Sequence, residues 1–431
     1  MSVTLARRIA FDVLRRVETE GAFAAELLHA RLGAAGDRGR APLKREDAAL
    51  ATELTLGVLR RLRLLDFLLE RHLSEPVASL DLEVLLALRL GLYQLRWLER
   101  VPARAAVHES VELVKRAKKR SAASLVNAVL RRAAESAGTP AEKLVPRELP
   151  PAERLGILHS HPAWMVERWL ARFGEARTVA LMEANNRAPR VTCAVLEPAR
   201  QSEIITGLEG AGLEVEPGRW LRAAVTVRGG NLAGTEAFRR GRVSIQDEAS
   251  QMVALLVDAR AGDSVLDLCA APGGKTALLA RTAGPAALLV AADLHPHRLR
   301  AMQAQLVALD AATPLPFARR FERILVDAPC SGTGTLERNP EIRWRLRPDD
   351  LADLHGRQVA MLAHALELLA PGGRLVYSTC SLEPEENESV VTEAHRNRRD
   401  ICLLSGEEAL APHLAEGISP KNFFAAILER R

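Results

Sequence analysis

Two cysteines follow predicted strands and could act on a substrate together. Cys330 stands in Asp-Ala-Pro-Cys after the apolar run 323–326, and Cys380 stands in Ser-Thr-Cys after the run 374–377. Neighbouring strands of a parallel sheet lie about 5 Å apart, so their ends can place two thiols around one pocket. A thiolate can form a covalent bond with a substrate. A single cysteine is more often a buried structural thiol, but the pair favours two functional thiols. The spacing alone does not tell which of them attacks.

A glycine-rich turn forms a second candidate site. The apolar run 265–268 leads towards Pro272-Gly273-Gly274, and an apolar helical pattern starts at Ala277. This order predicts strand, turn and helix, as in the first unit of a doubly wound sheet, where ligands bind at the carboxyl ends of the strands. Glycines let the backbone approach such a ligand. The turn lacks the glycines of a P-loop or a dinucleotide fingerprint, and an ordinary strand–helix connection is the alternative.

Acidic residues end most of the strands that we predict in the last part of the chain. The first three of these strands run into Asp293, Asp310 and Asp327. An acid at the position of Asp293 can accept hydrogen bonds from a ribose diol, or it can cap the next helix. Helices alternate with the strands, which favours an α/β sheet that binds a small ligand. The predicted strands are 288–292, 306–309, 323–326 and 374–377.

The composition limits the classes of protein that fit. With 431 residues, 48% of them hydrophobic, the chain is long enough for two or three domains with large cores. Five cysteines without a Cys-X-X-Cys spacing argue against a disulfide framework and a structural zinc site. No apolar run reaches the roughly 18 residues of a membrane span, and the N-terminus lacks a secretory pattern. We therefore expect a cytoplasmic protein with neither a membrane nor a metal as partner.

Positive charge is concentrated in the N-terminal third. The net charge is only +5, but the cations of segment 115–120 and of Arg131-Arg132 lie in a stretch without an acid between Glu112 and Glu135. On a helix followed by a turn, such cations can neutralise phosphates and bind nucleic acid in a salt-dependent way. A solvated helix face is the alternative. Aromatic residues make up only 4% of the chain, which argues against an extended base-stacking platform.

The periodicity of apolar residues predicts distinct regions. Residues 2–135 show helical spacing throughout and predict an all-α bundle with a loop at 34–40. Prolines and glycines mark 135–151 as a linker to a small α+β module. The further predicted elements are helices at 162–186, 201–211 and 246–257, strands at 190–196 and 223–227, a lead-in at 243–245, and an antiparallel edge hairpin of 401–404 with 423–428.

Together, these motifs resemble the Sun-type family of RNA cytosine-C5 methyltransferases. The helical N-terminal region is similar to the NusB-like RNA-binding domain of the RsmB branch of that family. The resemblance implies an all-α NusB-like domain at 1–138, an α+β linker or RNA-binding module at 152–242, and a Rossmann-like α/β methyltransferase domain at 243–431. The matching motifs are CAAPGGK at 269–275, DAPCSGTG at 327–334, STCS at 378–381, RNPEIRW at 338–344 and VSIQDEAS at 243–250.

The resemblance also implies S-adenosylmethionine as the methyl donor and assigns site residues. Cys380 matches the nucleophile of the family, and Cys330 matches a second cysteine implicated in product release. Asp293 takes the ribose position. The link from Arg298 to Asp310 is short for a full helix, loop and strand, and Lys421-Asn422 stands where the family more often has Asp-Gly. The implied cofactor-binding residues are Cys269, Ala270, Ala271, Pro272, Gly273, Gly274, Lys275, Asp293, Asp310 and Asp327.

The implied activity is methylation of C5 of a specific cytosine in small-subunit (16S) ribosomal RNA by a monomeric enzyme that needs no metal. C5 of cytosine is a poor nucleophile, and a thiolate that adds to C6 makes it reactive; the base must also be unstacked. A transfer RNA cytosine methyltransferase is one alternative, and an RNA-binding assembly or antitermination factor with an inactive domain is another. DNA cytosine methyltransferases also use a Pro-Cys thiol, but that interpretation leaves Cys380 unexplained.

Overall fold

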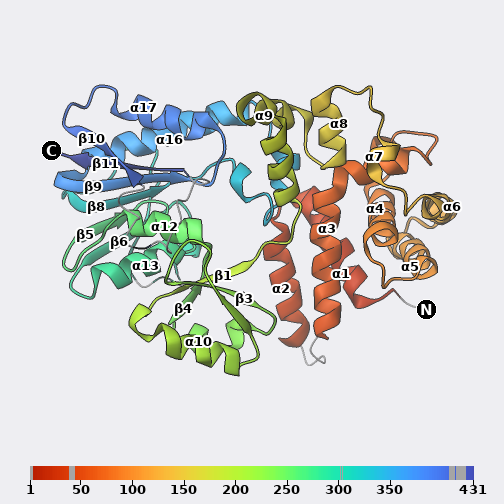
Figure 1. The fold of residues 1–431 in the computed structure, drawn as a ribbon, viewed down its shortest axis with the longest axis horizontal. Helices are drawn as coiled ribbons and strands as arrows, with labels where there is room; N and C mark the ends of the chain where they lie inside the picture. The colour runs from red at the N-terminus through yellow and green to blue at the C-terminus, as the bar shows by residue number, and fades with distance from the viewer. Residues whose placement is uncertain (1–2, 38–43, 301, 303, 407–412, 414–423) are drawn as a thin grey trace. The chain divides into compact units, whose positions relative to one another are not determined.

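The computed structural model describes residues 3–37, 44–300, 302, 304–406, 413 and 424–431. The chain divides into two compact units. The first consists of residues 1–188 together with 335–346, and the second of 189–334 together with 347–431. The second unit contains a small antiparallel sheet and a larger mixed sheet. Figure 1 shows the chain coloured from its N-terminus to its C-terminus.

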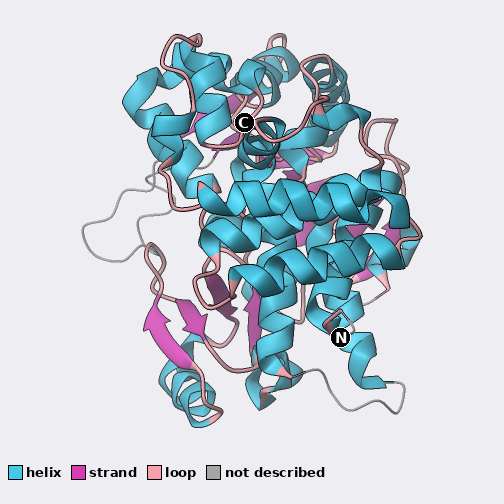
Figure 2. Cartoon of the chain, turned by 90° about the vertical axis from the view of Figure 1, so that its right-hand side faces the viewer, coloured by secondary structure: helices cyan, strands magenta, loops and turns pink. Residues whose placement is uncertain are grey.

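The N-terminal unit is helical throughout its described residues, which confirms the predicted all-α region. Apolar residues at helical spacing, such as Ile9, Val13 and Val17, are buried on one face of α1, and long helices lie side by side in Figure 2. The loop predicted at 34–40 is wrong as far as residue 37, because α2 continues to that point; 38–40 lie outside the described residues. The helices are α1 (Leu5–Glu20), α2 (Ala24–Asp37), α3 (Arg45–Glu70), α4 (Leu82–Trp97), α5 (Ala103–Arg116), α6 (Ala123–Glu135), α7 (Ala141–Leu144), α8 (Pro151–Leu158) and α9 (Ala163–Asn185).

Segment 335–346 belongs to the helical unit although its neighbours in sequence belong to the other unit. It contains the short helix α15 (Ile342–Arg345). Arg343 is fully buried there and donates hydrogen bonds to Ser160 O at 3.0 Å and Asn186 Oδ1 at 2.9 Å. Burial lowers the pKa of Arg343 to about 9. The buried guanidinium thus anchors this segment to residues at the ends of α8 and α9.

A four-stranded antiparallel sheet forms the first part of the other unit. The strands β1 (Val191–Val195) and β3 (Ala224–Arg228) and the helix α10 (Gln201–Gly210) lie where the sequence predicts them. The sequence analysis missed β2 (Glu214–Pro217), a largely exposed strand at the sheet edge with two glutamates. The strand β4 (Val243–Ile245) pairs with β1, so the small sheet extends to residue 245.

The larger sheet has seven strands in the order β10-β11-β9-β8-β5-β6-β7. The five strands β9, β8, β5, β6 and β7 are parallel to one another. The strands β11 and β10 form the predicted antiparallel hairpin at one edge. This arrangement confirms the Rossmann-like fold. Position 423, where the hairpin strand was predicted to start, and Lys421-Asn422 lie outside the described residues. The strands are β5 (Ser264–Asp267), β6 (Leu288–Asp293), β7 (Gln305–Ala308), β8 (Phe321–Asp327), β9 (Leu369–Thr379), β10 (Ile401–Leu404) and β11 (Phe424–Arg430).

Helices cover both faces of this sheet (Figure 1). On one face, α16 (Asp350–Glu367) and α17 (Glu388–His395) pack on Leu375 and Tyr377 of β9. On the other face, α12 (Glu248–Leu256) and α13 (Gly274–Ala283) pack on Val376 of the same strand. The alternation follows from the period of two in a strand. The helix α14 (Pro296–Leu299) has only four residues, as the short link before Asp310 predicts.

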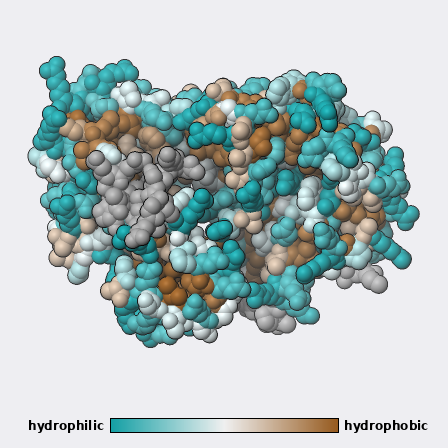
Figure 3. All heavy atoms as spheres, in the orientation of Figure 1, coloured by the Kyte–Doolittle hydropathy of each residue, from teal (hydrophilic) through white to brown (hydrophobic). Residues whose placement is uncertain are grey.

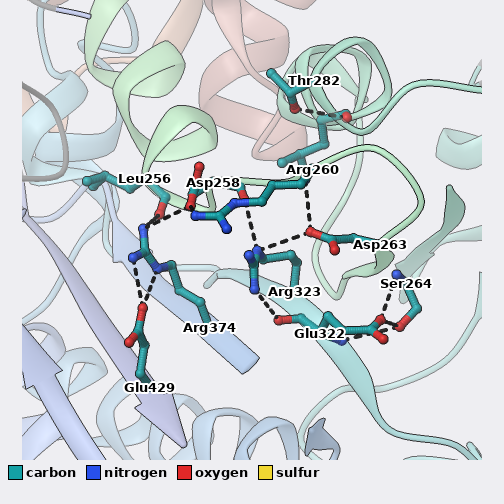
Figure 4. Close-up of polar contacts among 11 residues, drawn as sticks. Leu256, Asp258, Arg260, Asp263, Ser264, Thr282, Glu322, Arg323, Arg374 and Glu429 are labelled. Carbon is teal, nitrogen blue, oxygen red and sulfur yellow. Dashed lines mark hydrogen bonds and ion pairs between the residues drawn. The ribbon is translucent and has the colours of Figure 1, made fainter. Parts of the chain in front are cut away.

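A charged network links β8, β9 and β11 with the loop that precedes β5 (Figure 4). Arg374 forms an ion pair with Glu429 at 2.8 Å, and Arg323 donates to Asp258 O at 2.8 Å and pairs with Asp263 at 3.3 Å. Ligands of such sheets bind at the opposite, carboxyl ends of the strands. We therefore assign this network to the cohesion of the sheet.

One face of the molecule and the described helices can be compared with what a membrane-spanning segment requires. Hydrophilic residues predominate on the face shown in Figure 3, with hydrophobic residues between them. No described helix combines the length and the apolar character that crossing a membrane requires.

Candidate active site

The two cysteines predicted to act together lie side by side. Parallel pairing sets Asp327, the last residue of β8, opposite Ser378 of β9, and Ala328 N donates to Ser378 O at 2.9 Å. The chain then brings the sulfur atoms of Cys330 and Cys380 to 3.1 Å from each other. Two residues that are fifty positions apart in sequence thus form one thiol pair at the carboxyl edge of the sheet.

The two thiols have different surroundings. Cys380 is exposed, whereas Cys330 is only partly accessible. The hydrogen bond with Cys380, burial, and the negative charges of Cys380 and Glu386 raise the pKa of Cys330 well above its usual value. Cys330 therefore keeps its proton at neutral pH, because a raised pKa disfavours the thiolate.

A buried polar cluster that the sequence analysis missed supports the thiol pair. Glu386, Gln358, Ser331 and Ser381 are all buried and form hydrogen bonds with one another. Glu386 stands in an acidic run directly after Ser-Thr-Cys-Ser. Such a run usually indicates a solvated surface, so only its place beside a candidate nucleophile could have pointed to it.

The glycine-rich loop joins β5 to α13 as predicted. Gly273 has φ 107°, a backbone conformation that favours glycine. A Cβ atom there would lie 2.9 Å from Met302 Cγ, whereas one on Gly274 would find its nearest neighbour, in Gln246, at 3.7 Å. Gly273 is therefore required by the turn itself, whereas a Cβ atom on Gly274 would make only ordinary contacts with Gln246.

Asp293 ends β6 and holds the glycine-rich loop. Its carboxylate accepts hydrogen bonds from Ala271 N at 3.1 Å and from His295 N at 3.0 Å. The bond from His295 stabilises the turn after β6, and the bond from Ala271 fixes the loop. Both uses leave lone pairs on the carboxylate, since each oxygen can accept more than one bond. The capping alternative is wrong, because the N-cap of α14 is His295 and no side chain caps this helix.

Lys275 connects the loop with the strand that leads to Cys330. Its Nζ lies 2.5 Å from Asp327 Oδ2, and Ser378 Oγ donates to Asp327 Oδ1 at 2.8 Å. Burial opposes the charge of Lys275, but the attraction of Asp327 and then Asp267 outweighs it, so the pKa of Lys275 is raised. The charged lysine thus links the candidate cofactor loop to the ends of β8 and β9.

The acids of the strand ends surround the thiol of Cys269. Burial raises the pKa of this thiol first, and the charges of Asp267, Asp327, Asp293 and Asp310 raise it further. Asp310 lies after β7, and its Oδ1 accepts a bond from Ala312 N at 3.0 Å. The predicted site residues therefore converge on one edge of the sheet, although Asp310 uses part of its carboxylate in its own turn.

The residues present suit an adenosyl cofactor. The loop precedes the N-terminus of the ten-residue helix α13, and Asp293 provides the acceptor that a ribose diol needs. Gln246, missed by the sequence analysis as a site residue, is 8% exposed. Within the described part of the chain, its Oε1 and Nε2 have no hydrogen-bond partner, and the side chain lies beside Gly274. An unpaired buried amide next to the loop can bind polar groups of a ligand. No group of three or more His, Cys, Asp or Glu side chains that could hold a metal occurs among the described residues.

The helical unit carries a separate basic cavity of about 260 Å³. Arg116 and Lys118 from the predicted basic segment line it, together with Arg8 and Arg15 of α1. Two other lysines of that segment form ion pairs, Lys115 with Glu112 at 2.7 Å and Lys119 with Asp81 at 2.9 Å. The segment is thus partly neutralised, and two of its other cations, Arg116 and Lys118, line the cavity beside the acids Asp12 and Glu83.

Comparison with known proteins confirms the resemblance drawn from the motifs. Residues 254–418 match the family of 16S rRNA methyltransferase RsmB/F, residues 4–135 the NusB family, and residues 161–231 the RsmF/B-like ferredoxin-like domain. The probable ribosomal RNA small subunit methyltransferase B of Bacillus subtilis is 34% identical over 404 residues, which are 91% of this chain and 88% of that protein. The ribosomal RNA small subunit methyltransferase B of Sodalis glossinidius is 35% identical over 389 residues, 87% of each chain.

A solved structure agrees with these matches. The crystal structure of a methyltransferase homolog protein from Pyrococcus horikoshii has a TM-score of 0.55 and 27% identity, and the similarity covers 66% of this chain and all of that one. The identities and the coverage lead to one conclusion: the chain belongs to the RsmB family of ribosomal RNA small subunit methyltransferases.

Proposed function

We propose that this chain methylates C5 of a specific cytosine in small-subunit (16S) ribosomal RNA. The observation that carries the proposal is the pair of sulfur atoms, 3.1 Å apart, at the edge of the sheet where ligands of this fold bind. A two-thiol site suits a reaction in which one sulfur bonds to the base and must later leave it. The relatives in Bacillus subtilis and Sodalis glossinidius are described as small-subunit ribosomal RNA methyltransferases, which supports this RNA as the substrate.

S-adenosylmethionine is the methyl donor of the proposed reaction, and when bound it supplies a methyl group on a positively charged sulfur. The glycine-rich loop and the neighbouring Lys275 would hold S-adenosylmethionine. The residues of this loop are Cys269, Ala270, Ala271, Pro272, Gly273 and Gly274. Asp293 would accept hydrogen bonds from its ribose, and Gln246 would bind a polar group near Gly274 with the two atoms that are otherwise unpaired. Asp310 and Asp327 complete the acidic rim of this site.

Cys380 and Cys330 divide the remaining chemistry. Cys380 adds to C6 of the cytosine, which makes C5 nucleophilic enough to accept the methyl group. The C5 proton then leaves to a base, its electron pair restores the C5–C6 double bond, and the bond between C6 and Cys380 breaks. The exposed Cys380 suits attack, and Cys330, which keeps its proton, can form a hydrogen bond across 3.1 Å that stabilises Cys380 as it departs as a thiolate.

The remaining predictions from the sequence form part of the same proposal. The helical part (1–138) and the α+β module (152–242) bind RNA, and the part from 243–431 carries out catalysis, in a cytoplasmic monomer that needs no metal. The intact thiol pair argues against the non-catalytic factor, which has no need of it. The N-terminal match to the NusB family favours ribosomal over transfer RNA.

The test is the fate of the RNA with three forms of the protein. Wild-type protein, small-subunit RNA and S-adenosylmethionine should yield one 5-methylcytosine by bisulfite sequencing. Cys380→Ala should yield neither product nor covalent adduct, whereas Cys330→Ala should accumulate an adduct that denaturing gels resolve. A stable adduct from Cys380→Ala with none from Cys330→Ala would mean that Cys330 attacks and Cys380 assists release. Methylation of transfer RNA alone would mean that the substrate is transfer RNA and not ribosomal RNA.

A further inference from the structure

A buried carboxylate lies behind the two thiols. Glu386 is fully buried, in the turn η6 (Pro384–Glu386) before α17. Its Oε1 accepts hydrogen bonds from Ser331 N at 2.8 Å and from Gln358 Nε2 at 3.0 Å. Its Oε2 accepts bonds from the hydroxyl groups of Ser331 and Ser381. One carboxylate thus receives donors from both cysteine-bearing loops.

The two serines directly follow the two cysteines. Ser331 follows Cys330 and Ser381 follows Cys380, and both hydroxyl groups bond to the same Oε2 atom. The serine oxygens lie 3.0 Å apart, and the sulfur atoms lie 3.1 Å apart. The distance between the two serine oxygens is therefore nearly the same as the distance between the two sulfur atoms of the preceding cysteines.

Neighbouring elements also hold Glu386 in place. Gln358 of α16 donates to the carboxylate of Glu386 and to Pro329 O at 2.9 Å, and Tyr377 of β9 donates to the backbone carbonyl of Glu386 at 2.7 Å. Burying a carboxylate is costly unless donors offset the loss of water, and here four donors do so. Because this carboxylate bonds to both cysteine-bearing loops, it is placed to set the distance between them.

We propose that Glu386 is a positioning residue of this active site, whose carboxylate holds the two cysteine loops so that the sulfur atoms of Cys330 and Cys380 stay in contact. Glu386 does not touch the substrate and acts only through the loops. The catalytic consequence rests on the proposed function, because contact between the sulfur atoms serves the release of Cys380 from the base.

The informative variant is Glu386→Asp. It keeps the charge, so electrostatics alone do not change, but the shorter side chain withdraws by one methylene and cannot reach both loops. Glu393→Asp on α17 is the matched control, since that carboxylate is exposed and bonds His355 Nε2 at 3.1 Å instead. Ser381→Ala is a second variant, which removes one donor to the carboxylate, together with the bond from Glu383 N to the same hydroxyl, and leaves the carboxylate and its other donors in place.

The first measurement is the rate at which iodoacetamide alkylates each thiol in the RNA-free, full-length protein, resolved by peptide mass spectrometry. Loss of the sulfur contact removes the main cause of the raised pKa of Cys330, while the shorter carboxylate at position 386 keeps its negative charge and Tyr377 still faces the thiol. A fall of one unit in this pKa gives about tenfold more thiolate, so we expect Cys330 in Glu386→Asp to react about tenfold faster. Ser381→Ala should show a smaller increase, and Glu393→Asp none.

Wild-type alkylation of Cys330 in a folded Glu386→Asp protein would overturn the proposal. Circular dichroism and calorimetry with S-adenosylmethionine check folding. If Glu386→Asp does not fold, Ser381→Ala decides, and wild-type alkylation of Cys330 in that variant overturns the proposal equally.

The second measurement separates positioning from a general loss of structure. In Glu386→Asp, kcat for methylation should fall at least about tenfold, because small displacements of reacting groups are costly, while KM for RNA stays at the wild-type value. A raised KM with unchanged kcat would contradict the proposal. If the wild-type protein makes no 5-methylcytosine but the alkylation rates of the variants change as expected, the proposed function fails and the positioning role stands. If the wild-type protein methylates the RNA but the variants are alkylated at the wild-type rate, the proposed function stands and the positioning role fails.

Discussion

Replacing Asp267 by asparagine should change how the stability of the protein depends on pH. Asp267 ends β5, is 1% exposed and accepts a hydrogen bond from Thr276 Oγ1 at 2.7 Å. Burial, and to a smaller extent the charge of Asp327, raises its pKa from 3.8 to about 7, although the bond from Thr276 and the charge of Lys275 act in the opposite direction. A buried acid of this kind makes the free energy of unfolding depend on pH.

The raised pKa determines the sign of the effect. Between the unfolded-state value of 3.8 and the folded-state value of about 7, the folded protein binds more protons than the unfolded chain, so the free energy of unfolding falls as pH rises. At about 1.36 kcal/mol per pKa unit, the free energy of unfolding changes by about 4 kcal/mol over this whole pH range. From pH 5 to pH 8, wild type should lose about 2 to 3 kcal/mol relative to Asp267→Asn, whose amide does not titrate.

Urea unfolding of both proteins at pH 5 and pH 8, followed by circular dichroism without cofactor, measures this difference. Other groups titrate in both proteins, so their contributions cancel in the comparison. Asp267→Asn should be the more stable protein at pH 8, because it avoids a buried charge, and should lose that advantage at pH 5. An equal difference at the two pH values would refute the raised pKa, and a relative gain of wild type at pH 8 would mean that the pKa is depressed.

The remaining predictions concern the cofactor loop, the inserted segment and the basic cavity. Gly273→Val should weaken S-adenosylmethionine binding at least about tenfold in calorimetry, because φ 107° and the contact with Met302 force the loop to move. The control Gly274→Ala, which has room for the added methyl group, should keep the fold. Unchanged affinity of a folded Gly273→Val protein would contradict the role of the loop. Arg343→Met should lower the free energy of unfolding of the helical unit by about 2 to 4 kcal/mol, because four buried carbonyl-type acceptors lose their donors, whereas a loss below about 0.5 kcal/mol, typical of surface positions, would rule out this anchoring. Replacing Lys118 by Gln should reduce the slope of log affinity for RNA against log salt by about 0.7, and an unchanged slope in filter binding would show that it contacts no phosphate.

Local patterns in the sequence were sufficient for most of the fold. Apolar periodicity placed the helices of the N-terminal unit and most strands of both sheets, because backbone conformation depends mainly on nearby residues. It failed where the local signal was weak: α2 runs through residues predicted as a loop, and β2 is a short strand rich in glutamate. The motifs around Cys330 and Cys380 were enough to predict that the two thiols lie at neighbouring strand ends.

Only the tertiary structure decided what surrounds those motifs. The sequence left open the partners of Asp293 and Lys275, and it offered no sign that Glu386 is buried, because an acid in an acidic run looks like a surface residue until distant segments cover it. It also gave no indication that Arg343 anchors segment 335–346 within the helical unit. Burial of a polar group, and the shift of pKa that follows, depend on which parts of the chain pack around it, and those parts lie far from it in sequence.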